Sequence, residues 1–467
     1  MGGRALGVEL RPASGERNEG ELRPGRRRAF RLGDDRNISV LSLGLLAIAL
    51  LSCEGELFDG LESSPPNIIL IISDDQNYRD FGFMGSTVAR TPNLDRLADQ
   101  GVVFTQAYST SSVCRPALVS LLTGLYPHQW NHRLALLTSR GESDRESSIR
   151  QFRTLPRLLS KRGYATYQAG KNWEGTYEMA GFTHGITSAQ VSSLTGKARE
   201  IHSMVGRETM EPVYEFVREH REGPFFVWFA PLLPHHPYDA PAKYAELYRD
   251  ARMDRGELGY YANVSWFDDC VGQLLSYVDS LGIREQTLIV LVVDNGWTTT
   301  GDDKTEGYGF GGARGKGTLH EAGFRTPIVI NWPGRVAAGG VRQMLVSTVD
   351  LFPTFLEYAD VPSPPGRAGK SLVPLVEGRA TQGHDMIVGS QQVIVWSPVG
   401  PRPTVARFLR NELWHYIERP EAEPQLYDVV ADPDEETNLA EDHSDLITKF
   451  RKSITTERQR HLRMLRE

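Results

Sequence analysis

The sequence feature that most constrains the fold is a set of continuous apolar runs that stop abruptly at polar residues. The runs are NIILII at 67–72, FFVWF at 225–229 and TLIVLVV at 287–293. The first run leads into Asp74 and Asp75, and the third leads into Asp294 and Asn295. Runs of this length and composition are typical of strands buried on both faces of an α/β sheet.

Helical signals lie between these runs. The segment TPNLDRLADQG at 91–101 carries a Thr cap, a Pro in its first turn, an apolar face and a final Gly, so it predicts a helix. Segments 152–162 and 211–220 predict two more helices. Strands that alternate with helices predict an α/β fold with a large central, mostly parallel sheet covered by helices on both faces.

The C-terminal part of the chain is expected to form a smaller antiparallel sheet. Its strands are predicted at 414–417 (WHYI) and 425–429 (QLYDV), after a turn-rich stretch at 361–366. The final helix, predicted over 444–465, is expected to pack weakly because its end is highly charged. The predicted divisions are a catalytic domain at 67–375, a C-terminal subdomain at 385–450 and a charged helical tail at 451–467.

Oxygen-rich side chains are expected to meet at one edge of the central sheet. Ligands of open α/β sheets bind outside the carboxyl ends of the strands, where Asp74, Asp75, Asp294, Asn295 and His235 would converge. Carboxylate and amide oxygens suit Ca²⁺, with Mg²⁺ as the second choice. A single acid at a strand end is more often a turn residue or helix cap. Two strands that each end in paired oxygen ligands favour a metal site.

Composition excludes several classes of protein. The formal net charge of −7 offers no general attraction to phosphate, so no nucleic-acid partner is expected. No apolar run reaches 18 residues, which excludes a polytopic membrane protein. Three cysteines are too few for a disulfide scaffold.

Residues 1–66 resemble a leader rather than a folded domain. Residues 1–36 hold nine arginines and six acids without a regular period, which predicts disorder. The uncharged core at 38–51 predicts a signal peptide, and the RRAF at 27–30 loosely resembles a twin-arginine export signal. Ser52-Cys53 resembles a lipobox, so Cys53 is either a lipid anchor or incidental to plain cleavage. The long leader is also consistent with a start codon chosen too far upstream. Every reading predicts an exported protein, periplasmic or on the outer surface.

Cys114 opens a predicted helix that ends near Gly124. A cysteine at a helix N-terminus lies at the positive end of the helix dipole, which favours anionic chemistry there. Taken alone, such a cysteine is more often a small buried residue than a nucleophile.

The sequence around Cys114, CRPALVSLLTGLYPH, is similar to the signature of the type I sulfatases, C-x-P-S-R followed by L-x-T-G-x-x-P-H. Six further blocks match the family's pattern in order, and they are PNIILIISDDQ, TPNLDRLADQGVVF, PHHPYDAPAKY, VVDNG, GKGTLHEAGFRTP and LYDVVADPDEETNLA. The chain therefore resembles the type I, formylglycine-dependent sulfatases of the alkaline-phosphatase-like superfamily over most of residues 66–440.

The resemblance implies a mechanism. A formylglycine-generating enzyme would convert Cys114 to formylglycine, whose hydrate attacks the sulfur of a sulfate ester. His235 would protonate the departing alcohol, and Lys171 and Lys316 would bind sulfate oxygens. Without the resemblance, each lysine is more simply a surface residue and His235 a packing residue of a loop. The implied metal ligands are Asp74, Asp75, Cys114, Asp294 and Asn295.

Two departures from the family pattern bear on activity. Leu118 stands where the signature has its Arg, and Arg115 is the nearest cation. We predict that Arg115 points toward the active-site anion and partly replaces the missing Arg, the alternative being that it faces solvent or a remote acid. After Lys171, many relatives have a His two residues on, where this chain has Trp173 followed by Glu174.

The sequence as a whole predicts an exported sulfatase that hydrolyses sulfate esters of a glycan or another alcohol. Two alternatives stay open at this point. One is a catalytically impaired protein of the same fold that binds sulfated glycans without cleaving them. The other is a hydrolase of phosphonate or phosphate esters on the same scaffold.

Overall fold

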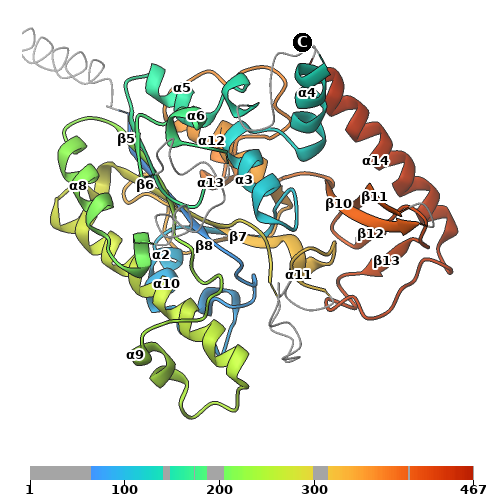
Figure 1. Cartoon of the computed structure of the whole chain (residues 1–467), viewed down its shortest axis with the longest axis horizontal. Coiled ribbons are helices and arrows are strands. Elements are labelled where there is room, and N and C mark those ends of the chain that lie inside the picture. Colours follow the sequence, from blue (N-terminus) through green and yellow to red (C-terminus); the bar gives the residue numbers. More distant parts are fainter. Residues whose placement is uncertain are drawn as a thin grey trace, which may run out of the picture. The chain divides into compact units, whose positions relative to one another are not determined.

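The computed structural model describes residues 65–139, 148–172, 174–186, 204–297, 314–397 and 400–465 (Figure 1). Predictions about the leader, including the signal peptide and Cys53, lie outside the described residues, as does Trp173. No helix in these ranges is long and apolar enough to cross a bilayer.

A nine-stranded sheet forms the centre of the fold. Its strands follow the order β4-β3-β5-β1-β6-β7-β2-β8, and β9 also pairs with β2. The pairs of β1 with β5 and β6 and the pair of β3 with β5 are parallel, whereas β7 runs antiparallel to β6 and β2. The predicted mostly parallel sheet is therefore confirmed. The strands are β1 (Asn67–Ser73), β2 (Val102–Tyr108), β3 (Ala165–Gly170), β4 (His184–Gly185), β5 (Phe225–Ala230), β6 (Thr287–Val293), β7 (Arg325–Asn331), β8 (Gly340–Arg342) and β9 (Val346–Ser347).

Helices cover both faces of this sheet (Figure 1). Ile68 and Leu70 of β1 pack in a core with α3, α5 and α12, while Ile69 and Ile71 face a core formed with α2, α8 and α10. The alternation of these side chains across β1 follows from the pleat of a strand. The α-helices are α2 (Pro92–Asp99), α3 (Cys114–Thr123), α4 (Pro127–Ser139), α5 (Leu155–Lys161), α6 (Tyr177–Ala180), α8 (Glu211–His220), α9 (Ala242–Ala245), α10 (Arg255–Ser280), α11 (Glu321–Phe324), α12 (Leu351–Tyr358), α13 (Val373–Val376) and α14 (Ser444–Met464).

The three predicted helices are present with small differences at their ends. Helix α2 occupies the segment predicted at 91–101, and α8 matches 211–220. Helix α5 begins at Leu155 rather than at 152, because Thr154 is its extended N-cap residue and a proline occupies its first turn.

A second, four-stranded sheet is antiparallel, as predicted. Its strands are β10 (Ile387–Ser397), β11 (Gly400–Arg410), β12 (Trp414–Glu418) and β13 (Gln425–Asp428), paired in that order. Phe408 and Ile417 on one face pack against Tyr108 and Phe324 of the larger part of the protein. Residues 64–467 form one compact unit, so the division at 375–385 stays a prediction.

The predicted weak packing of the final helix is wrong. Helix α14 covers the other face of the small sheet, where Ile447, Phe450 and Ile454 are buried beside Leu409 and Tyr416. The three apolar residues recur every three or four positions and form a continuous stripe. The prediction of weak packing relied on the high overall charge of the helix and overlooked this stripe, which buries one face of the helix.

Candidate active site

The carboxyl ends of β1 and β6 bring four polar residues together. The two strands pair in parallel register through Ser73 and Val293, so the residues that follow them lie side by side. The Asp75 N–H donates to Asp294 Oδ1 (3.2 Å), and Asn295 Nδ2 donates to Asp75 Oδ1 (2.8 Å). Asp75 has φ of 63°, a left-handed conformation that non-glycine residues rarely adopt. Such strain occurs mainly at functional sites, and here it turns the chain so that both carboxyls face the same centre.

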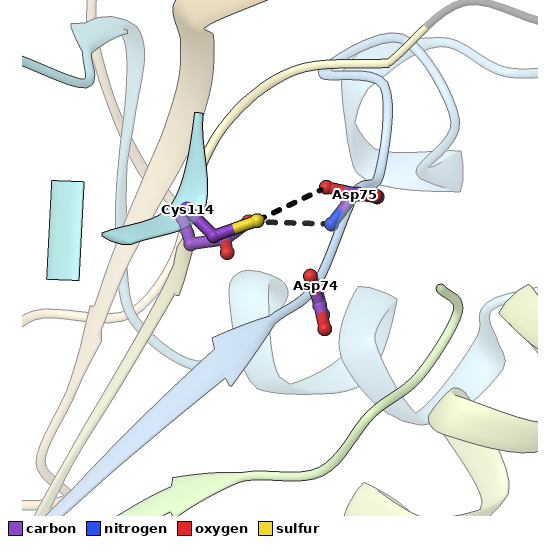
Figure 2. Close-up of side chains that lie close together, drawn as sticks. Asp74, Asp75 and Cys114 are labelled. Carbon is purple, nitrogen blue, oxygen red and sulfur yellow. Dashed lines mark hydrogen bonds between the residues drawn. The ribbon is translucent and has the colours of Figure 1, made fainter. Parts of the chain in front are cut away.

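Cys114 joins this group from the first residue of α3. Its Sγ lies 3.9 Å from Asp75 Oδ1, and Figure 2 shows the side chain directed at the turn formed by Asp74 and Asp75. One ligand atom from each of Asp74, Asp75, Cys114 and Asp294 lies within 4.8 Å of the others, and all four residues are buried. This is the convergence that the sequence predicts.

The donor set fits a hard divalent cation. Asp74 Oδ2 and Asn295 Oδ1 are buried oxygens without a hydrogen-bond partner among the described residues. Burial raises the pKa of Asp294 to about 6 despite the nearby Lys171, with Asp74 and Asp75 adding repulsion. Several buried carboxylates with unpaired oxygens are costly unless a cation joins them, and oxygen ligands suit Ca²⁺ or Mg²⁺.

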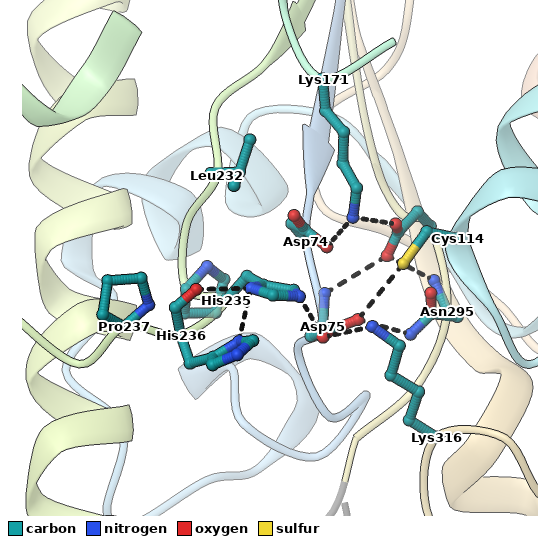
Figure 3. A network of polar contacts seen from close by, with 12 residues as sticks. Asp74, Asp75, Cys114, Lys171, Leu232, His235, His236, Pro237, Asn295 and Lys316 are labelled. Carbon is teal, nitrogen blue, oxygen red and sulfur yellow. Dashed lines mark hydrogen bonds and ion pairs between the residues drawn. The ribbon is translucent and has the colours of Figure 1, made fainter. Parts of the chain in front are cut away.

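Two buried lysines balance the carboxylates. Lys171 Nζ contacts Asp74 and lies 3.3 Å from Asp294 Oδ2, and Lys316 Nζ lies 2.5 Å from Asp75 Oδ2. Figure 3 shows the two side chains entering from opposite sides of the carboxylates. Burial opposes the charged form of both lysines, but the carboxylates outweigh it and raise the pKa of each above its usual value. Both ammonium groups therefore stay charged, which is what binding an anion requires.

His235 approaches the same carboxylates from the loop after β5 (Figure 3). Its Nε2 lies 3.3 Å from Asp75 Oδ2, and its Nδ1 donates to the His236 carbonyl (2.6 Å). Burial lowers the pKa of His235 to about 4, and Asp75 offsets this only in part. A single proton on Nδ1 leaves Nε2 as the atom that can exchange a proton with a ligand.

The Cys114 thiol is not activated as a thiol. Burial raises the pKa of Cys114 to about 12, and the favourable charge of Lys171 is opposed by Asp294 and Asp75. The expectation that the N-terminus of α3 favours anionic chemistry stays a prediction. The unmodified side chain is therefore a neutral thiol beside the carboxylates.

Arg115 is held by Glu174. Its Nε donates to Glu174 Oε1 (2.7 Å) and its Nη2 to Oε2 (3.3 Å). This arrangement corresponds to the alternative in which Arg115 faces an acid, and the approach to a substrate anion stays a prediction. Leu118 is 2 % exposed and packs in the core on one face of the central sheet. An apolar residue at that position is explained by this core contact.

Two residues that the sequence did not indicate support the His235 loop. Asn263 on α10 donates its Nδ2 to the carbonyls of Pro234 (3.2 Å), His235 (3.2 Å) and Pro237 (3.0 Å). Arg207 donates its Nη2 to the carbonyls of Leu232 (2.7 Å) and His235 (2.7 Å). Both bind backbone atoms, so no residue pattern in the loop could have identified them.

The small sheet also contributes to the site. Gln391 on β10 accepts a hydrogen bond from the Ser111 hydroxyl (2.8 Å), in the segment just before Cys114. The Gly317 N–H donates to the Ser112 carbonyl (2.9 Å), which ties the segment of Lys316 to the same turn. The turn that precedes Cys114 is therefore fixed by parts of the chain about 200 to 280 residues away.

A second buried acidic group, formed by Glu321, His415 and Glu435, does not fit a metal. Glu321 is already paired with Arg410 (2.9 Å) and Arg325 (3.1 Å). Two guanidinium groups at this carboxylate satisfy its oxygens and repel a cation. The group is a structural connection between α11 and the small sheet.

Fold and site together place the chain among the alkaline-phosphatase-like hydrolases. Within that class the chain belongs to the sulfatase family, whose model matches residues 66–361. A second family model, described as N-sulphoglucosamine sulphohydrolase, C-terminal, matches residues 311–460. Sulfatases are sulfuric ester hydrolases, and the resemblance seen in the sequence is confirmed.

Individual relatives agree with this assignment. The chain is 30% identical over 384 residues to N-acetylgalactosamine-6-sulfatase of Rattus norvegicus, covering 73% of this chain and 70% of the relative. It is 26% identical to N-acetylgalactosamine-6-O-sulfatase of Bacteroides thetaiotaomicron, covering 89% and 98%. A solved phosphonate monoester hydrolase of Agrobacterium radiobacter shares the fold, with a TM-score of 0.65, 21% identity and coverage of 85% and 96%.

Proposed function

We propose that this protein is an exported sulfatase that removes sulfate from sulfated glycans, using a formylglycine made from Cys114 and a bound Ca²⁺ ion. The observation that carries the proposal is the buried centre in which Asp74, Asp75, Asp294 and Cys114 lie within 4.8 Å of one another. Lys171 and Lys316 frame this centre with positive charge. The lysine charges and a metal would together stabilise the negative charge that builds up on the sulfate oxygens in the transition state.

Asp74, Asp75, Asp294 and Asn295 would hold the metal, with the modified Cys114 as a further ligand. The bound cation supplies Lewis-acid stabilisation of the charge that develops on the sulfate oxygens. The orphaned Asp74 Oδ2 and Asn295 Oδ1 would gain a partner in this way. Mg²⁺ is the second choice of metal.

The lysines would bind and orient the sulfate group. In the structure their ammonium groups pair with Asp74, Asp294 and Asp75. When a cation neutralises those carboxylates, Lys171 and Lys316 can direct their N–H groups toward sulfate oxygens. Each offers a compact point charge with three donors, which suits a tetrahedral oxyanion.

His235 would supply the proton for the departing alcohol. Its Nδ1 keeps its proton on the His236 carbonyl, so the proton that His235 transfers must first be taken up by Nε2. The hydroxyl of the formylglycine hydrate would give up its proton as it attacks sulfur, and the bond from sulfur to the alcohol oxygen would break with its electron pair going to that oxygen. Nε2 would pass a proton to the alcohol oxygen, so that one proton leaves the hydroxyl and one reaches the alcohol. Arg207 and Asn263 hold the loop that aims this ring.

The substrate class is inferred from relatives. Two relatives are named for removing sulfate from N-acetylgalactosamine, and the C-terminal family model is named for a sulfated glucosamine. We therefore assign this chain a sulfated glycan as substrate.

Mass spectrometry of the peptide that contains Cys114 tests the proposal. Protein produced together with a formylglycine-generating enzyme should carry an aldehyde at position 114. An intact thiol in fully folded protein, with no release of sulfate, would instead support the non-hydrolytic glycan binder. The departures at Leu118 and Trp173 make this comparison informative.

The phosphonate monoester hydrolase fold neighbour favours one second candidate, hydrolysis of phosphonate or phosphate monoesters. Aryl sulfate, aryl phosphate and aryl phosphonate esters offered in competition distinguish the two. Faster hydrolysis of the aryl sulfate supports the sulfatase. Sulfate monoesters carry one negative charge and phosphate monoesters carry two, so a site suited to sulfate needs less positive charge. The reverse preference supports the second candidate.

Export and anchoring form part of the proposal. The uncharged core at 38–51 and Cys53 motivate it. Fractionation of producing cells should place the protein outside the cytoplasm, and Cys53→Ala should release it from the membrane fraction if Cys53 is lipidated.

A further inference from the structure

A cavity of about 530 Å³ opens on the small sheet, at the end of β11 and β12 and beside α14. This volume lies within the range typical of small-molecule sites, about 300–1,000 Å³. Its lining residues are Val405, Arg407, Glu418, Arg419, Pro420, Ala422, Pro424 and Arg451.

The cavity carries an excess of positive charge. Arg407 Nη1 lies 3.1 Å from Glu418 Oε1, and Arg451 Nε lies 3.6 Å from Glu418 Oε2. The Tyr416 hydroxyl also donates to Glu418 Oε2 (3.3 Å), so this carboxylate is already shared among three donors. Arg419 has no ion pair among the described residues. Three arginines and a single acid line the cavity, and the charge is not balanced.

A fourth arginine, Arg458 on α14, adds to this field. Burial lowers the pKa of Arg458 to about 10, the nearby Arg407 lowers it further, and Glu418 opposes the change only in part. Arg458 Nη1 and Arg407 Nε are buried and lack a hydrogen-bond partner among the described residues. These two donors are closed off from solvent, so they add positive charge beside the cavity rather than hydrogen bonds to a ligand in it.

The arginines also affect the pKa of His128 on the neighbouring helix α4. Burial lowers the pKa of His128 to about 2, and the charges of Arg458 and Arg407 contribute to the shift.

The cavity is separate from the active site. Arg407 and Glu418 lie two positions from Leu409 and Tyr416, on the same face of the small sheet, because side chains of a strand alternate. That face is covered by α14, whereas the opposite face packs on the part of the protein that carries Tyr108 and Phe324. The small sheet therefore lies between these side chains and Tyr108 of β2 and Phe324 of α11.

We propose that this cavity binds a sulfate group borne on a saccharide, at a point of the glycan away from the ester that is cleaved. The inference rests on the proposed sulfated-glycan substrate. Guanidinium groups grip oxyanions through paired N–H donors, and three or four of them around one cavity can hold a sulfate without a metal. The cavity's size accommodates a sugar ring together with its sulfate.

Isothermal titration calorimetry with the Cys114→Ala protein tests the inference, because this protein should bind substrate without turnover. Three probes are compared: a sulfated oligosaccharide, the same oligosaccharide without sulfate, and inorganic sulfate. The test variants are Arg451→Gln and the double variant Arg407→Gln/Arg451→Gln. The matched control is Arg460→Gln, since Arg460 is also an arginine of α14 but is paired with Glu457 (2.7 Å).

The double variant should weaken binding of the sulfated oligosaccharide roughly 10-fold or more, as expected for the loss of charge-assisted hydrogen bonds. Arg460→Gln should have no effect, and the unsulfated oligosaccharide should bind weakly to every variant. Turnover of a small aryl sulfate by protein that retains Cys114 should be unchanged in all variants.

Unchanged affinity in the double variant, or equal binding of the unsulfated oligosaccharide, would overturn the inference. A decrease for inorganic sulfate alone would show a site for free anions and would overturn the saccharide assignment. Arg451→Gln is the single variant that perturbs folding least, because the Arg451 side chain is 58% exposed. Failure of the proposed function would appear separately, as a thiol at position 114 and no sulfate release.

Discussion

Arg115 and Glu174 form a two-pronged ion pair that joins the start of α3 to the segment after β3. Arg115 follows the candidate nucleophile directly, and Glu174 lies three residues after Lys171. The Glu174 side chain is 4% exposed and that of Arg115 is 31% exposed, so the carboxylate of this pair is buried. The pair therefore links the backbone positions of Cys114 and Lys171, the two groups that the proposed function directs at one sulfate.

The first prediction concerns this pair. Arg115→Gln and Glu174→Gln should each lower the free energy of unfolding by about 1–3 kcal/mol, the usual cost of losing a partly buried charged hydrogen bond. Each should also lower kcat, because Lys171 loses its alignment with Cys114. A double-mutant cycle should show that the two effects are strongly coupled. Strictly additive effects on both stability and kcat would contradict the linkage.

The second prediction concerns the metal. Asp294→Ala should lower both bound Ca²⁺, measured by elemental mass spectrometry, and activity, the latter by at least roughly 100-fold because Lewis-acid stabilisation is lost. The control is Asp268→Asn, because Asp268 is a buried carboxylate that accepts from the N–H groups of Asn93 and Leu94 (3.0 and 2.8 Å). The control should be less stable but keep its metal. Full activity after exhaustive chelation would argue against a catalytic metal.

The third prediction concerns the loop that carries His235. Asn263→Ala removes the donor for three loop carbonyls, so kcat should fall roughly 10-fold or more while bound metal is unchanged. Asn331→Ala is the matched control, since Asn331 is equally buried and donates to the Leu97 carbonyl (2.9 Å) at a different part of the sheet. Both variants should lose similar stability. Equal kcat in the two variants would show that Asn263 has no role in positioning His235.

The fourth prediction concerns pH and the docking of α14. His461 Nδ1 lies 3.2 Å from His128 Nε2, and both rings stack with Tyr126. Burial and neighbouring cations lower the pKa of His128 to about 2 and of His461 to about 3. The unfolded chain binds these protons more readily, so the stabilisation is complete above about pH 6.5 and is lost progressively as pH falls toward 3.

Denaturant unfolding at several pH values measures this effect. The protein should lose stability between about pH 6.5 and 3, and His461→Phe should make the loss smaller because one titrating ring is removed while the stack with Tyr126 is kept. A pH dependence identical in His461→Phe and the parent protein would show that His461 does not contribute.

Much of the site was predictable from local sequence. Asp74, Asp75, Asp294 and Asn295 follow strands, and the ends of adjacent parallel strands meet whatever connects them. The support given by Asn263 and Gln391 could not be predicted in this way, because each binds groups that are distant in the sequence and depends on how α10 and β10 pack. The same limit applies to Arg115, whose partner Glu174 lies 59 residues away.

The misjudged packing of α14 has a different cause. Its charge suggested a solvated tail, but stability depends on the stripe of Ile447, Phe450 and Ile454 rather than on average composition. The cluster of arginines at the cavity could not be predicted from the sequence either. Arg451 and Arg458 lie on this helix and become a cluster only when α14 packs beside Arg407.

Release of inorganic sulfate from sulfated oligosaccharides tests the central claim most directly. The measurement uses protein shown to carry formylglycine at position 114, in the presence of Ca²⁺, with Cys114→Ala as the control. We predict sulfate release from at least one sulfated glycan and none from the control. Absence of release from every sulfated glycan and aryl sulfate, with formylglycine and metal both present, would contradict the assignment of this chain as an active sulfatase.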